Sequence, residues 1–87
     1  MHLSSNGDLY EYLRSLILIL SERGRGDLAA RVDFACRHSA SSAAEFLGES
    51  KLALEAVIES GSGILKANEI ADLKTAVTEI REAFESR

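Results

Sequence analysis

The chain has 87 residues, of which 46% are hydrophobic and 28% are charged. This length supports one domain, residues 1–87, and the composition excludes intrinsic disorder. Proline is absent and only six glycines are present, which argues against an all-β fold with many turns. The formal net charge of −4 excludes a general electrostatic attraction to nucleic acid.

The single cysteine cannot form an internal disulfide bond, and with two histidines it cannot complete a common zinc site. We therefore expect no metal and no cofactor. The sequence shows no secretory signal and no apolar run approaching about 18 residues. These features predict a soluble cytoplasmic protein that does not enter a membrane.

The first predicted helix spans about residues 6–22. Asn6 or Asp8 is expected to cap its N-terminus, and Gly24 and Gly26 follow its end. By composition, residues 16–20 could form a buried strand, but a lone strand would have no partner in the chain. The helix is therefore preferred, with an apolar stripe of Leu9, Leu13, Leu16, Ile17 and Leu20.

The second helix is predicted over about residues 27–39, with Asp27 as its N-cap, and the third over about 43–60. Ser42 and Glu45 have the spacing of a capping box, in which each side chain bonds the other's free amide. The stripes are Leu28, Val32, Ala35 and Cys36 in the second helix, and Phe46, Leu47, Leu54, Val57 and Ile58 in the third. Gly48 either permits close approach of another backbone or is merely tolerated, at about 1 kcal/mol relative to alanine.

The fourth helix is predicted over about residues 68–86, after the loop at residues 61–63. Its seam consists of Ile70, Leu73, Val77, Ile80 and Phe84. Short connections favour antiparallel neighbours, so the sequence predicts an all-α fold, a small antiparallel four-helix bundle. A domain of this size is marginal alone, which favours self-association.

The residue pattern offers little for catalysis. Cys36 and His38 are two positions apart on a helix and point in different directions, so they cannot form a dyad, and Cys36 is expected to be a small buried hydrophobe. No glutamate has a histidine three residues later, as a di-metal bundle site requires. The glycines lack the companions of a phosphate loop. We expect no enzyme, no catalytic residues and no small-molecule substrate.

Some large side chains fall outside the main stripes. In the first helix, either the whole helix is enclosed or the side chains of Tyr12, Leu18 and Ile19 form a dimer or partner face. In the second helix, Phe34 is either a core residue or the centre of a site for an acidic partner or a nucleic-acid backbone. Its cationic neighbours are Arg31, Arg37 and His38, and the third helix contributes one further outlier, Leu52.

Three functions remain open at this point. The leading hypothesis is a small interaction module whose partner is a second copy, as a homodimer, or another protein. The alternative is an acidic immunity protein or antitoxin that neutralises a basic toxin, because residues 45–87 carry nine acidic and five basic side chains. The third is weak nucleic-acid binding through arginines, which the acidity of the whole chain disfavours: Arg23, Arg25, Arg31 and Arg37.

Overall fold

The computed structural model describes residues 5–85, and within that range every regular element is helical. The elements are α1 (Asn6–Glu22), α2 (Gly26–Arg37), the short 3-10 helix η1 (His38–Ala40), α3 (Ala43–Gly61) and α4 (Ala67–Glu85). Residues 16–20 are helical, so the strand alternative is excluded. The predicted all-α fold is confirmed.

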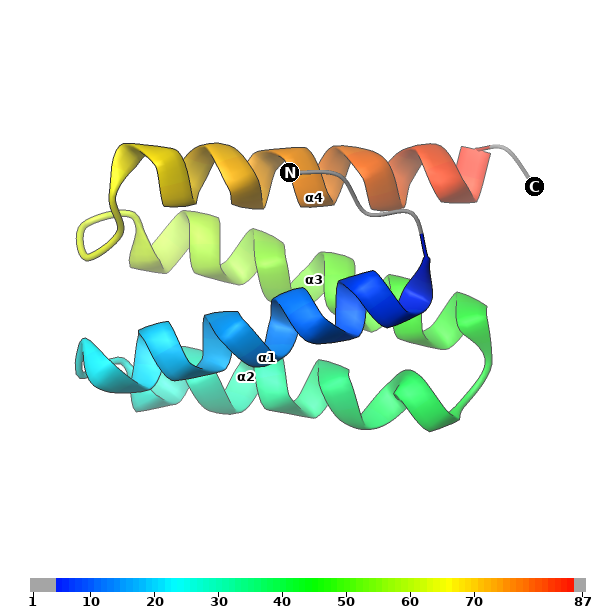
Figure 1. Ribbon diagram of the computed structural model, residues 1–87, viewed down its shortest axis with the longest axis horizontal. Helices are drawn as coiled ribbons and strands as arrows, with labels where there is room; N and C mark the ends of the chain where they lie inside the picture. Colours follow the sequence, from blue (N-terminus) through cyan, green and yellow to red (C-terminus); the bar gives the residue numbers. More distant parts are fainter. Residues whose placement is uncertain (1–4, 86–87) are drawn as a thin grey trace.

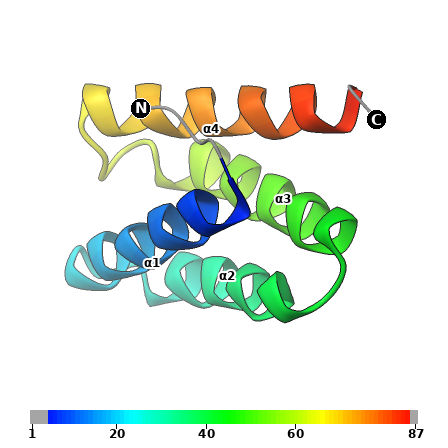
Figure 2. The same cartoon turned by 45° about the vertical axis from the view of Figure 1, so that its right-hand side comes forward.

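The four helices run alternately in opposite directions and pack in the order of the sequence (Figure 1). α2 lies against both α1 and α3, and α3 lies against both α2 and α4. In Figure 2, α4 lies at the top of the molecule and α2 at the bottom, with α1 and α3 between them. One face of α2 is therefore left without a helical neighbour. None of the helices described is both long enough and apolar enough to span a membrane.

The predicted apolar stripes form the core. Leu13 and Leu20 of α1, Leu54 of α3 and Leu73 of α4 are fully buried. Ile17, Ile58, Ile70 and Phe84 are only partly buried and pack around this core. A cluster of this kind is the main source of stability in a small helical domain, because it removes apolar surface from water.

Small residues of α3 lie at two buried positions, Ser50 and Gly61, and at one partly buried position, Gly48. Ser50 is fully buried, and its hydroxyl has no hydrogen-bond partner in the described part of the chain. A Cβ atom on Gly48 would lie 3.9 Å from Cζ of Phe84, an ordinary van der Waals distance, so close approach does not require glycine there. A Cβ atom on Gly61 would lie 3.1 Å from Cδ1 of Leu28, which is crowded.

The helix starts differ from the predicted caps. The N-cap of α1 is Ser5, whose Oγ accepts a hydrogen bond from the backbone N–H of Asp8 at 3.1 Å. The prediction of Asn6 or Asp8 was wrong because both lie inside the helix. Asp27 is not an N-cap either, since α2 begins one residue earlier and the Asp27 carboxylate accepts hydrogen bonds from Arg25 at 3.0 and 3.1 Å.

The predicted capping box at α3 is half formed. Ser42 Oγ accepts from the Glu45 N–H at 3.1 Å, but among residues 5–85 Glu45 returns no bond to Ser42. The glutamate half of such a box occurs instead at α4, where Glu69 accepts a bond from the Lys66 N–H at 2.8 Å. A carboxylate in the first turn satisfies an N–H that the helix itself leaves free.

The helix ends agree with the predictions to within two residues. α2 stops at Arg37 because η1 takes over the chain, so the predicted end at residue 39 was too late. Gly24, with φ of +78°, occupies the left-handed conformation after α1, as expected of a residue that closes a helix. α4 begins at Ala67, one residue before the predicted start, and the predicted end at residue 86 lies outside the described residues.

The loop between α1 and α2 contains two arginines that reach the other half of the chain. Arg23 donates to the Glu69 carboxylate, with Nη2 to Oε2 at 2.9 Å, and to the Ile64 carbonyl at 3.0 Å. Arg25 donates to the Ser60 carbonyl at 2.8 Å. This loop therefore holds the end of α3 and the start of α4. The bond from Arg23, supported by the Lys66 N–H, lowers the pKa of Glu69 to about 2.

Candidate functional site

Phe34 is a half-exposed aromatic side chain on the outward face of α2. The residue as a whole is 50% exposed, whereas Val32 and Ala35 on the other side of the same helix are fully buried. The guanidinium carbon of Arg31 lies 5.7 Å from the ring centre, within range of a cation–π contact. The imidazole of His38 meets the ring edge-on, with centroids 4.9 Å apart. Phe34 is therefore held between two side chains while half its surface remains in water.

The neighbours of Phe34 are themselves fixed by hydrogen bonds and ion pairs. His38 Nδ1 lies 3.0 Å from the Phe34 carbonyl and must carry the hydrogen, because a carbonyl only accepts. Arg37 pairs with Asp33 at 3.0 Å. Arg31 Nη2 lies 3.7 Å from Glu49 of α3, and its enclosed Nη1 has no acceptor in the described residues. The guanidinium of Arg31 is thus incompletely satisfied within one molecule.

Two further large hydrophobic side chains are exposed. Leu18 of α1 is 65% exposed and Leu52 of α3 is 53% exposed. Both lie almost opposite the buried stripe of their own helix. They therefore point away from the core on the two helices that pack against α2.

Tyr12 and Ile19 lie on the other side of α1. Both are partly buried, and with Ser15 and Leu16 they line a small cavity of about 50 Å³ against Glu69 and Asp72 of α4. Burial, followed by the charges of Asp72 and Glu69, raises the pKa of the Tyr12 phenol well above its ordinary value. Of the two interpretations of these side chains, the structure places them within the monomer, whereas Leu18 stays in water.

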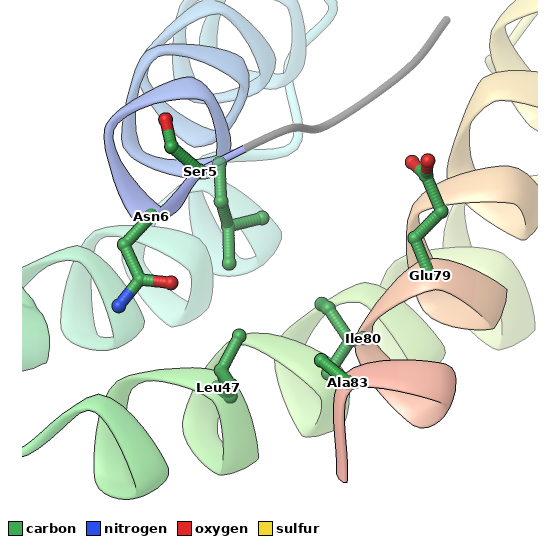
Figure 3. Close-up of a pocket in the computed structure, with 7 residues that line it drawn as sticks. Ser5, Asn6, Leu47, Glu79, Ile80 and Ala83 are labelled. Atoms are coloured by element: carbon green, nitrogen blue, oxygen red, sulfur yellow. The ribbon is translucent and has the colours of Figure 1, made fainter. Parts of the chain in front are cut away.

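A groove lies between the start of α1 and the C-terminal half of α4, at the opposite end of the molecule. Its volume is about 140 Å³. Figure 3 shows Ser5 and Asn6 on one side, Glu79, Ile80 and Ala83 on the other, and Leu47 from α3. The side chains that line it are mostly apolar, with a hydroxyl, an amide and a carboxylate at hand. Such a lining suits packing against an apolar group.

The groups that could carry chemistry are dispersed. Cys36 is buried, as predicted, and burial is the main reason that the pKa of its thiol is raised. A thiol in this environment is a poor nucleophile. Within residues 5–85, no set of three or more histidine, cysteine, aspartate or glutamate side chains is positioned to hold a metal ion.

The arginines behind the nucleic-acid hypothesis are all paired with carboxylates, and some of the acids behind the inhibitor hypothesis are paired as well. Each arginine considered for nucleic-acid binding has a carboxylate partner in the structure: Arg23 with Glu69, Arg25 with Asp27, Arg31 with Glu49, and Arg37 with Asp33. Among the acids of α3, Glu49 and Glu55 pair with Arg31 and Lys51. Neither the acidic inhibitor nor the nucleic-acid hypothesis gains a specific contact from this arrangement, and both stay predictions.

Comparisons of the chain with protein-family models, with curated proteins and with solved structures gave no match.

The structure brings together some of the site residues that were predicted from the sequence. Phe34 contacts both Arg31 and His38, whereas Leu18 and Leu52 lie on the neighbouring helices α1 and α3. The groove between α1 and α4 was not predicted, because it depends on the relative placement of two helices that are distant in the sequence. Asp27 and Ala30, which share the outward face of α2, were also missed, although their spacing from Phe34 is visible in the sequence.

Proposed function

We propose that the protein is a non-enzymatic interaction module that associates with a second copy of itself, and that its contact surface is centred on α2. We call this contact region the α2 surface, and it comprises Leu18, Arg31, Phe34, Arg37, His38 and Leu52. The observation that carries the proposal is the distribution of apolar exposure. The large hydrophobic side chains that are exposed within residues 5–85 belong to α2 and to the two helices that pack against it: Phe34 on α2, Leu18 on α1 and Leu52 on α3.

The charge of α2 supports contact between identical molecules. Residues 26–37 contain two aspartates and two arginines, so their formal charges cancel, whereas the whole chain has a net charge of −4. Two copies of an acidic protein repel each other, and the cost is smallest when they meet through a neutral region. The acid-rich part of the chain, residues 45–87, is less suitable as a contact surface between two copies, because its acidic side chains would repel each other.

The side chains of the α2 surface are those that contribute most to protein interfaces. Aromatic residues and arginine are enriched at interface centres, and a few of them dominate the binding energy. Phe34 is already fixed between Arg31 and His38. A side chain that is ordered before binding loses less conformational entropy when the contact forms.

Sedimentation equilibrium at tens of micromolar protein tests the proposal. We expect the wild-type mass to be that of a dimer, and Phe34→Ser to shift the population to monomer with unchanged helix content by circular dichroism. Leu18→Ser and Leu52→Ser should weaken the dimer less, because they lie at the edge of the surface. A monomeric wild type, or a Phe34→Ser variant that dimerises as well as the wild type, would refute the proposal.

A further inference from the structure

We infer that two copies pair through antiparallel α2 helices in one defined register, an inference that rests on the proposed self-association. Four outward residues of α2 form a single row: Asp27, Ala30, Phe34 and Arg37. Their spacing of three, four and three positions keeps them on one helix face. The row is exposed along its whole length, with the side chain of Asp27 67% exposed, Phe34 50% and the side chain of Arg37 77%.

This row has the same spacing when it is followed from either end. A two-fold axis between two antiparallel helices therefore superimposes the row on its own reverse. Asp27 then faces the partner's Arg37, and Ala30 faces the partner's Phe34. The row is negative at one end, apolar in the middle and positive at the other end. An antiparallel copy is complementary to it at every position.

The charges at the ends of the row favour this register over its nearest alternative. With the axis between Ala30 and Phe34, Asp27 faces the partner's Arg37 at both ends of the contact. If the axis passed through Phe34 instead, Asp27 would lie opposite residue 41, beyond the end of α2, and neither pair of opposite charges would form. Specificity depends on such differences between competing arrangements.

The sizes of the central side chains fit as well. Ala30 is small and exposed, so it leaves room beside the helix for the partner's Phe34 ring. The row spans about 15 Å along the helix. Asp27 and Arg37 already bind Arg25 and Asp33 within the monomer. Because both remain mostly exposed, their outward atoms can take a second ionic partner.

Two charge reversals test the register. Asp27→Arg should place arginines opposite each other, and Arg37→Asp should place aspartates opposite each other. Each variant is expected to raise the dimer dissociation constant by roughly tenfold or more in sedimentation equilibrium at low salt. The matched controls are Glu82→Arg and Lys74→Asp on the exposed side of α4, which change the net charge by the same amounts away from α2. We expect these controls to dimerise within about threefold of the wild type.

The decisive measurement is an equimolar mixture of the two single variants. In a heterodimer of Asp27→Arg with Arg37→Asp, position 27 of each copy faces an opposite charge at position 37 of the other. We therefore expect the mixture to form heterodimers, seen by native mass spectrometry, with a dissociation constant within about threefold of the wild type. This rescue also shows that both variants are folded.

The outcomes separate the two proposals. If the wild type is a dimer but the single variants dimerise equally well, or if their mixture does not recover, the register is wrong while self-association stands. If the wild type is a monomer, the proposed function fails and the register with it.

Discussion

Arg23 and Glu69 stand 46 positions apart, and the guanidinium of the first donates two parallel hydrogen bonds to the carboxylate of the second. This contact joins the C-terminal end of α1 to the first turn of α4. Bidentate pairs of this kind are stronger and more directional than a single charge contact. The same carboxylate also accepts the Lys66 N–H, so one side chain both caps α4 and holds it to α1.

The first prediction concerns the acid stability that this pair provides. The folded-state pKa of Glu69 is about 2, against an ordinary value of 4.5. A lowered pKa stabilises the fold at pH values above the ordinary pKa. This contribution is lost as the pH falls toward the pKa of the folded state. We expect Arg23→Met to melt at a lower temperature than the wild type at pH 7, with the difference shrinking between pH 4.5 and about 2.

A matched variant separates the charge of Glu69 from its role as a cap. Glu69→Gln keeps an oxygen that can accept the Lys66 N–H but loses the negative charge. It should therefore show the same flattened pH dependence as Arg23→Met, and Glu69→Ala should be less stable still. A constant difference between wild type and Arg23→Met across this pH range would contradict the assignment.

The second prediction concerns Gly48. Since a Cβ atom there would make only ordinary contact with Phe84, Gly48→Ala should raise the free energy of unfolding by about 0.5–1 kcal/mol. Gly61→Ala is the comparison, because its Cβ atom would crowd Leu28 and offset the gain. Urea denaturation measures both. A destabilised Gly48→Ala would show that the α3–α4 contact is tighter than the structure indicates.

The third prediction concerns the buried hydroxyl of Ser50. Its desolvation is not compensated by a hydrogen bond in the described residues, so Ser50→Ala should stabilise the protein by about 1 kcal/mol. Ser15→Ala on the exposed side of α1 is the control, because it carries the same gain in helix propensity and removes only an exposed hydroxyl, which donates to the Glu11 carbonyl at 3.2 Å. If the two substitutions have equal effects on urea denaturation, the Ser50 hydroxyl has a partner in solution.

The fourth prediction concerns Ile19. This side chain faces Glu69 and Asp72 across the small cavity between α1 and α4. Ile19→Glu should lower the free energy of unfolding by about 1–3 kcal/mol, because it loses apolar burial and adds a third acid. Ile19→Lys should cost roughly half as much, since its ammonium group meets two carboxylates. Thermal unfolding compares them, and equal losses would show that Ile19 does not face these acids.

Helix periodicity identified the large side chains outside the apolar stripes but left open which of them would be exposed. Leu18, Phe34 and Leu52 lie off their stripes, and the structure exposes all three. Tyr12 and Ile19 also lie off the stripe, at a smaller angle than Leu18, and are partly buried. A helical wheel fixes the direction of a side chain relative to its own helix, whereas burial depends on where the next helix lies. The sequence alone could not show that α4 covers that side of α1.

The caps were missed for a local reason. Ser5, Asn6 and Asp8 all have side chains that can accept a free N–H, and the choice depends on where the backbone turns into the helix. The arginine contacts of the α1–α2 loop were missed for a different reason. Arg23 and Arg25 bind carbonyls near residues 60–64, and sequence spacing carries no information about contacts between such distant segments.

The order of packing described above has a kinetic consequence. Each helix packs mainly against the one before it in the sequence. Most native contacts therefore join residues that are close in the chain. Proteins with such local contacts fold quickly. The Arg23–Glu69 bond closes one of the longer stretches of chain, so we expect it to form after the folding barrier. Arg23→Met should then accelerate unfolding and leave the refolding rate nearly unchanged in stopped-flow measurements.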